Sequence, residues 1–198
     1  IVTAMQTIVS RELSPLAPAV LSVGSIHGGL KHNVIPDVVK LQLTLRSYTS
    51  AVRLRMIEAI KRITKNLALA AGMPADKMPE VAVKDEYTPV AFNEPALTNR
   101  IAKVFSAEIG ADNVIETSPV MGGEDFGRYG QGVPKIPSLI FWLGAVDRKQ
   151  FAASQNGGRS LPALHSAYFA PEYEPTIRTG VRAMVAAGLE LLAKGINN

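Results

Sequence analysis

Hydrophobic and polar positions in the first half of the chain recur at helical intervals in some stretches and alternate in others, which predicts both helices and strands. Residues 1–13 repeat apolar side chains at helical intervals, and residues 19–29 are rich in strand-forming residues and end at a Gly-Gly pair. Residues 38–46 alternate strictly, with valine and leucines on one face and Lys40, Gln42, Thr44 and Arg46 on the other. We therefore expect a helix followed by two strands, of which the second is buried on one face only.

A longer helix and a third strand complete this first region. Ser50 is the expected N-cap of a helix whose apolar stripe continues to a stop near Gly72, and residues 79–87 (PEVAVKDEY) are typical of a short strand. The order helix, strand, strand, helix, strand corresponds to a ferredoxin-like β-α-β-β-α-β unit without its first strand. We assign residues 1–87 to this domain.

The pattern changes in residues 88–198, which we assign to a second region of α/β class. A helix is expected after Asn93, its predicted cap, with Pro95 in the first turn. Residues 112–120 predict a short strand, and the unbroken apolar run 136–146 is typical of a strand buried on both faces. An amphipathic helix from residue 174 is expected to end at Gly195.

Composition and charge argue against several classes of function. The net charge of +4 comes from scattered Lys and Arg residues, so we expect no nucleic-acid partner, and the absence of cysteine excludes disulfides and thiolate metal sites. Neither a membrane-spanning run nor an export signal is evident, so we expect no membrane partner and a cytoplasmic location. The first residues lack an initiating Met and read as helix interior, so we expect a piece of a longer protein.

Two groups of polar residues are candidates for chemistry, each with a structural alternative. His165 lies in a loop rich in proline and aromatic residues, where an isolated histidine is more often a surface or packing residue than a metal ligand. Asn33 and Arg46, taken as a pair on one sheet face, suit a carboxylate ligand, because guanidinium binds carboxylates with two hydrogen bonds. A turn-forming Asn and a solvated Arg are the commoner alternative.

The stretch MGGEDFGRYG, residues 121–130, allows several interpretations. Gly122 and Gly123 could present backbone N–H groups to an anion ahead of a short helix. The acids that follow could be metal ligands or general bases, or could stabilise the start of that helix. From the pattern alone, helix capping is favoured over catalysis.

Five motifs in order, GSIHGG, HNVIPD, LTLRS, MGGEDF and LHSAYFAPE, together resemble the C-terminal half of the zinc-dependent amidohydrolases of the hippurate hydrolase and indoleacetyl-amino-acid hydrolase group. That group is related to aminoacylases and carboxypeptidases. The resemblance covers nearly the whole chain. It implies a lid domain, which also forms a homodimer, and the C-terminal part of an α/β metallohydrolase catalytic domain.

The resemblance also implies residue roles. His165 matches a metal-ligand histidine, and Asn33 and Arg46 match lid residues that reach the substrate carboxylate, the Asn often from the partner subunit. Gly122 and Gly123 match a loop that lines the substrate pocket. The implied cofactor is a divalent metal, zinc or else manganese, cobalt or nickel, with two ions in the intact protein.

The implied reaction is hydrolysis of N-acyl or N-aroyl amino acids by metal-activated water. The family's general base and its other metal ligands lie in a part of the family pattern that these residues do not match. We therefore expect no catalytic residue in this chain and no activity from it alone. The alternative function is a non-catalytic dimerisation or anion-binding module.

Overall fold

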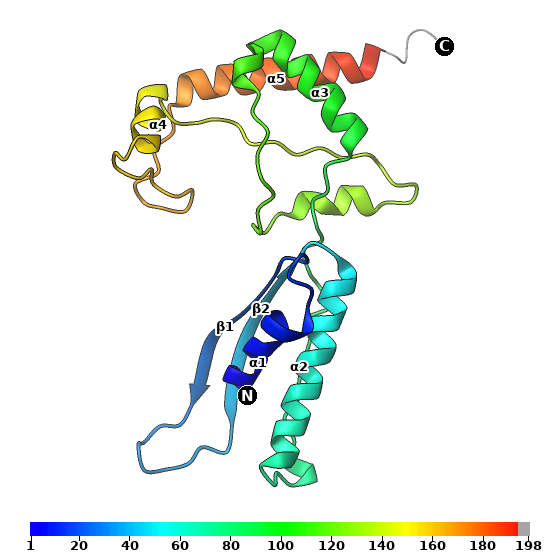
Figure 1. Cartoon of the computed structure of the whole chain (residues 1–198), viewed down its shortest axis with the longest axis vertical. Coiled ribbons are helices and arrows are strands. Elements are labelled where there is room, and N and C mark those ends of the chain that lie inside the picture. The colour runs from blue at the N-terminus through cyan, green and yellow to red at the C-terminus, as the bar shows by residue number, and fades with distance from the viewer. Residues whose placement is uncertain (194–198) are drawn as a thin grey trace. The chain divides into compact units, whose positions relative to one another are not determined.

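The computed structural model describes residues 1–193 and is a mixed α/β structure, mostly helical, with a two-stranded antiparallel sheet (Figure 1). The chain divides into two compact units. The first comprises Ile1–Val90 and Pro119–Arg128, and the second comprises Ala91–Ser118 and Tyr129–Asn198, of which residues up to 193 are described.

The sheet of the first unit is a hairpin of β1 (Ala19–Gly28) and β2 (Val39–Ser47), as the sequence predicts. Leu21 pairs with Leu45 and Val23 with Leu43, but the next apolar residue of β1 comes three positions later, at Ile26. A register shift between Val23 and Ser25 absorbs the extra residue, so that Ile26 still pairs with Leu41. The irregularity keeps one face of the hairpin apolar, which the simple alternation of residues could not do.

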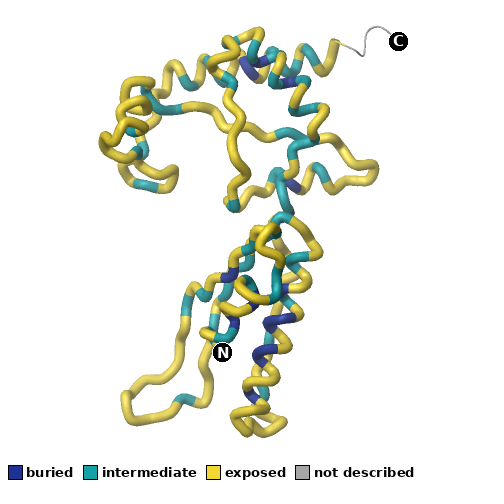
Figure 2. The backbone as a smooth tube through the Cα atoms, viewed as in Figure 1, coloured by how far each residue is buried: buried dark blue, intermediate teal, exposed yellow. Residues whose placement is uncertain are grey.

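Helices cover that apolar face. α1 (Val2–Thr7) continues into one π-helical stretch, η1 (Ile8–Glu12), and α2 (Ser50–Ala70) runs alongside; a short 3₁₀ turn, η2 (Ala75–Lys77), follows. Their apolar side chains and the sheet enclose a core of Met5, Ile8, Leu21, Met56, Ala59, Ile60 and Ile63. Figure 2 shows this burial as a repeated stripe along α2. The predicted cap of α2 is wrong by one residue, because the Thr49 hydroxyl, and not Ser50, accepts the hydrogen bond from the Val52 N–H.

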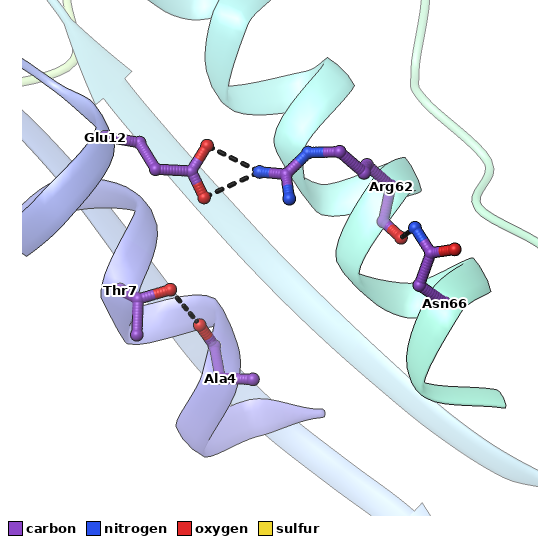
Figure 3. A network of polar contacts seen from close by, with 5 residues as sticks. All are labelled: Ala4, Thr7, Glu12, Arg62 and Asn66. Carbon is purple, nitrogen blue, oxygen red and sulfur yellow. Dashed lines mark hydrogen bonds and ion pairs between the residues drawn. The ribbon is translucent and has the colours of Figure 1, made fainter. Parts of the chain in front are cut away.

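An ion pair ties the end of η1 to α2 (Figure 3). Arg62 Nη2 lies 2.6 Å from Glu12 Oε1 and 2.5 Å from Glu12 Oε2, while the Asn66 side chain donates to the Arg62 carbonyl at 2.9 Å. Arg62 is more than half exposed, so this pair orients the N-terminal helix more than it stabilises the fold.

The strand predicted at residues 79–87 is not formed, so the predicted five-element order lacks its last member. A strand exists only where a neighbour completes its backbone hydrogen bonds. In a ferredoxin-like unit the last strand pairs with the first, and the described residues contain no strand before α1. Residues 79–87 therefore follow an extended but unpaired path.

The second unit is built on α3 (Pro95–Ile109) packed against α5 (Tyr173–Leu192). Its buried residues are Ile101, Phe105 and Ala183. Arginines bind the opposite helix near its C-terminus: Arg100 contacts the Glu190 carboxylate at 2.7 Å and its carbonyl at 2.6 Å, and Arg182 contacts the corresponding atoms of Glu108 at 2.8 and 2.5 Å. Each arginine thus binds a carbonyl near the end of the described helix.

Asn93 is not the cap of α3, contrary to expectation. Glu94 caps it, because its carboxylate accepts from the N–H groups of Ala96 (3.0 Å) and Leu97 (2.6 Å). The Asn93 side chain instead donates to the Ile140 carbonyl and accepts from the Ile140 N–H, both at 2.8 Å. It thereby substitutes for one residue of a neighbouring strand.

The two strands predicted in the second region are likewise absent from the described structure. Residues 111–113 form a 3₁₀ turn, η3 (Ala111–Asn113), and residues 114–120 are irregular. Residues 136–146 are extended but unpaired, and much of the run is exposed instead of buried on both faces, since no strand of the described chain lies beside it.

Two helices, α4 and α5, lie near the end of the described chain. α4 (Arg148–Gln155) was not predicted; its signal is Asp147, whose carboxylate accepts from Lys149 and Gln150 N–H groups. The described part of α5 ends at Leu192, and the predicted stop at Gly195 lies outside the described residues. Within residues 1–193, no helix combines the length and apolar character needed to cross a bilayer.

Candidate functional site

Arg46 lies on the polar face of β2, opposite the leucines that enter the core, and pairs across the hairpin with Val20. Its side chain is exposed, and its Nη1 donates a hydrogen bond to the backbone carbonyl of Met121. Because Met121 precedes Gly122 and Gly123, the structure brings the predicted arginine to the glycine loop, seventy-five residues away in sequence. No sequence signal marks a carbonyl as the partner of a particular arginine.

The segment that carries the glycines is anchored just after them. Glu124 Oε1 accepts from the Phe126 N–H at 3.0 Å, at the start of the 3₁₀ helix η4 (Asp125–Gln131). The interpretation of this acid as a helix cap is thereby confirmed. Gly127 packs directly on the chain at residue 90, where an added Cβ would lie 2.4 Å from the Val90 carbonyl oxygen.

Tyr87 receives two further contacts in the same unit. Arg128 Nη2 donates to the Tyr87 carbonyl at 2.8 Å, and the guanidinium carbon of Arg53, from α2, lies 4.0 Å from the centre of the Tyr87 ring. The aromatic face attracts that cation. Residues 119–128 are therefore held against residues 87–90 by the packing of Gly127 and by the Arg128 hydrogen bond, while Arg53 joins Tyr87 to α2.

The backbone conformation and packing at Gly122 and Gly123 do not require glycine. Neither has a positive φ, an added Cβ at Gly123 meets nothing within 4 Å, and one at Gly122 only touches Val120 at 4.0 Å. Gly127, by contrast, is required by packing. The first two glycines thus leave open space beside the carbonyl that holds Arg46.

Asn33 lies at the other end of the hairpin from Arg46. It is exposed in the turn between β1 and β2, where Gly28 pairs with Val39, whereas Arg46 is seven residues further along β2. At about 3.3 Å per residue, Val39 lies about 23 Å along the strand from Arg46. Asn33 is therefore not on the face of β2 that carries Arg46, and the joint role of the two residues stays a prediction.

His165 belongs to the second unit and lies in an exposed turn. The Ser166 N–H donates to the Ala163 carbonyl at 2.9 Å, and the Phe169 N–H to the Ser166 carbonyl at 3.0 Å, which fixes the backbone on each side of the imidazole. Within residues 1–193, no three His, Asp or Glu side chains lie close enough to hold a metal ion. Taken by itself, the described chain does not fit a metal site.

Comparisons with known proteins identify the family. Residues 17–167 match Peptidase family M20/M25/M40, whose members typically use divalent metal ions. The chain is 33% identical over 150 residues to thermostable carboxypeptidase 2 of Saccharolobus solfataricus, covering 76% of this chain and 36% of the relative. It is 36% identical over 143 residues to N-acetyldiaminopimelate deacetylase of Streptococcus thermophilus, covering 72% of this chain and 36% of the relative.

A solved structure agrees with this. The crystal structure of a presumed aminohydrolase from methicillin-resistant Staphylococcus aureus matches 97% of this chain and 43% of its own, with a TM-score of 0.60 and 27% identity. The chain thus spans about a third of the length of the curated relatives it matches. It belongs to the M20/M25/M40 peptidase family, relatives of which are hydrolases acting on amide bonds.

Proposed function

We propose that this chain forms the part of an M20 hydrolase that binds the substrate carboxylate, and that the complete protein cleaves N-acyl or N-aroyl amino acids. The hydrogen bond from Arg46 to the Met121 carbonyl supports the proposal most directly, because it joins the predicted carboxylate ligand to the glycine loop within one unit. In this proposal residues 1–87 are the ferredoxin-like lid without its first strand, and residues 88–198 are the C-terminal part of the catalytic domain.

The chemistry of Arg46 suits that role. A guanidinium carries five N–H donors, so one bond to a carbonyl leaves others for a substrate carboxylate. A hydrogen bond to such a charged group contributes about 1.5–3 kcal/mol. The space left by Gly122 and Gly123 would allow the rest of the substrate to pass close to the backbone.

Metal chemistry belongs to the complete protein in this proposal. We retain His165 as one zinc ligand there, with the other ligands of the two ions supplied by a part of the protein that this chain does not include. Since the described residues do not form a metal site, we derive no hydrolytic step from them and expect no hydrolysis by the chain alone.

The lid is also the proposed homodimer contact. β1 and β2 pair only with each other among the described residues, so the sheet has open edges available for a partner strand. The position of Asn33, far along the hairpin from Arg46, is compatible with its serving the site of the partner subunit. Light scattering that shows a strict monomer at high concentration would contradict this.

The decisive experiment compares Arg46→Ala with Lys40→Ala in the complete enzyme. Lys40 is an exposed cation on the same face of the same strand, which makes it a matched control. Arg46→Ala should lower kcat/KM for N-benzoylglycine about ten- to a hundred-fold, by the free energy of one charged hydrogen-bonded pair. The control should change it little, and N-benzoylglycinamide, which lacks the carboxylate, should be less affected by Arg46→Ala. Equal losses on both substrates would assign Arg46 a structural role.

A non-catalytic dimerisation or anion-binding module is the second candidate, favoured by the absence of a metal-binding group from residues 1–193. Both candidates predict that the chain alone does not hydrolyse N-benzoylglycine with added zinc, cobalt or manganese. Hydrolysis by the chain alone would contradict both candidates. In the complete enzyme, His165→Ala should remove most activity, and unchanged activity there would reject the proposed ligand.

A further inference from the structure

Helix α4 (Figure 1) ends at the one Asn-Gly pair of the sequence, Asn156 and Gly157, and both residues are exposed. Asn156 is the C-cap, and Gly157 follows with a φ of 79°, a left-handed conformation that glycine adopts without strain. The Gly158 N–H donates to the Ala153 carbonyl at 2.9 Å, which is one of the two hydrogen bonds of a Schellman motif. The second, from the Gly157 N–H, is not formed, so that N–H has no acceptor among the described residues.

This unpaired N–H distinguishes Asn156 from the other asparagines of residues 1–193. After each of those, the N–H of the next residue is engaged in backbone hydrogen bonding. The engaged groups belong to Val34, Glu94 and Val114, which donate to carbonyls at 3.3, 2.9 and 3.1 Å, and to Leu67 and Arg100, which lie inside α2 and α3. Within the described chain, only Asn156 precedes both a glycine and an N–H that is available to react.

We propose that Asn156 is a modification site at which the side-chain amide is lost spontaneously, with water as the co-reactant. The Gly157 nitrogen gives up its proton and bonds to Cγ of Asn156; the Cγ–Nδ2 bond breaks, and Nδ2 leaves as ammonia with that proton. One water molecule then opens the resulting cyclic imide at either of its two carbonyl carbons, and the product is aspartate or isoaspartate. Glycine permits the ring closure, because it has no Cβ to obstruct the approach of its nitrogen.

Asn113 provides a matched comparison within the second unit. Like Asn156, it is exposed, follows the end of a helix and donates from Nδ2 to the carbonyl four residues earlier. That hydrogen bond must break before either side chain can react, and at an exposed residue it breaks at small cost. Asn113 differs in that the N–H of Val114 is engaged, and in that its own Oδ1 accepts a hydrogen bond from Arg148. We therefore expect Asn113 to persist where Asn156 reacts.

Loss of the amide changes the end of α4 in two ways. A carboxylate at position 156 cannot donate to the Ala152 carbonyl, and its negative charge lies at the negative end of the helix dipole. Isoaspartate also adds a carbon to the backbone before Gly157, which alters the spacing that brings the Gly158 N–H to the Ala153 carbonyl. Hydrogen exchange at the Gly158 N–H should therefore be faster in the modified chain than in the fresh one.

The test incubates the whole chain at mildly alkaline pH and needs no hydrolytic assay, since the inference does not rest on the proposed substrate. Trypsin cleaves after Lys149 and Arg159, and the peptide 150–159 that it releases contains Asn156 as its one asparagine. Mass spectrometry of successive samples should find Asn156 converted at least about ten-fold faster than Asn113, because glycine leaves the attacking nitrogen unobstructed. Isoaspartate and aspartate should both be present.

Gly157→Ala places a Cβ beside the attacking nitrogen and should slow the conversion of Asn156 about ten-fold or more. Alanine is strained at a positive φ, so the same change is also made in a synthetic peptide of residues 150–159, which has no fold to lose and should be slowed as well. Gly188→Ala is the control, because its added Cβ meets nothing within 4 Å, and it should leave the rate unchanged. Conversion of Asn156 no faster than that of Asn113, aspartate without isoaspartate, or an unchanged rate in both forms of Gly157→Ala would overturn the proposal.

Discussion

The two units contain helices of similar apolar pattern, yet they bury very different cores. In the first unit two helical segments and a hairpin enclose seven buried apolar residues, three of them almost completely inaccessible. In the second, α3 and α5 bury only three, and large apolar side chains remain exposed along α5 and the extended segment 136–143.

The difference lies in which neighbours each element has. α2 meets a sheet face on one side and is exposed on the other, so most of its apolar stripe is buried. α5 meets α3 on one side only and carries a second stripe that the described residues do not cover. The sequence pattern determines on which side of a helix or strand the apolar side chains lie, but their burial depends on a second layer that covers that side.

Deletion of core volume in the first unit is the strongest test of this contrast. Met56 is completely buried between α2 and the sheet, and Met56→Ala should lower the free energy of unfolding of that unit by about 2–5 kcal/mol. Leu54→Ala, half exposed on the same helix, should change it by no more than about 0.5 kcal/mol.

The measurement is urea unfolding followed by two probes. Far-UV circular dichroism reports both units, while fluorescence of Trp142 reports the second. Met56→Ala should move the first transition and leave the fluorescence transition in place. If both transitions move together, the units unfold as one and the comparison fails.

A matched pair of glycines compares a packed backbone with an open one. Gly127→Ala would push a Cβ to within 2.7 Å of three backbone atoms at residues 89 and 90, and should cost about 1–3 kcal/mol. Gly123→Ala meets nothing and should leave stability within about 0.5 kcal/mol. The same urea series reads both; equal costs would mean that residues 119–128 do not pack on residues 87–90 as described.

Arginine contacts between α3 and α5 should matter moderately. Arg100 is about one third exposed and binds both a carboxylate and a helix-end carbonyl, so Arg100→Ala should cost the second unit about 1 kcal/mol after allowance for solvent screening. Arg178→Ala, which removes an exposed pair within α5, should cost about 0.3–0.5 kcal/mol or less. Trp142 fluorescence measures both, and a larger loss for Arg178 would contradict the assignment.

Much of the first unit could be predicted from its sequence. The alternation in β2 and the stripe of α2 each require one neighbour, and that neighbour lies within the first 70 residues. The strands expected at 79–87, 112–120 and 136–146 failed for the converse reason, since a strand is defined by pairing that the described residues do not provide. Local signals also competed at Asn93, where an amide could cap a helix or pair with a backbone, and Glu94 provided the cap.

The candidate site was less predictable than the fold. The alternation of β2 predicts that Arg46 lies on the polar face of the strand. Its hydrogen-bond partner could not be predicted, because it is a backbone carbonyl, a group that every residue possesses. Asn33 and Arg46 were grouped by residue chemistry, whereas the hairpin register separates them along the strand. How far apart two residues lie along a hairpin depends on where its turn falls, and the alternation of residues does not give the position of the turn.

The smallest expected effect is a pH dependence of the second unit, through the cap of α3. Hydrogen bonds from the N–H of Leu97 and then of Ala96 hold the pKa of the Glu94 carboxyl below its ordinary value of 4.5. Because the folded pKa is lowered, the unfolded chain binds the proton more readily. The stability from this cap is therefore complete above pH 4.5 and is lost as the pH falls through the lower, folded pKa.

Glu94→Gln should test this by removing the titrating group from the cap of α3 while keeping a hydrogen-bond acceptor. At pH 7 the variant should unfold at lower urea than the unsubstituted chain, as followed by Trp142 fluorescence, and the gap should close as the pH is lowered past the folded pKa of Glu94. Glu116→Gln changes a charge on an exposed loop of the same unit and removes no cap, so it should behave like the unsubstituted chain throughout. A gap that stays constant with pH would show that the Glu94 carboxylate does not support the helix start through its charge.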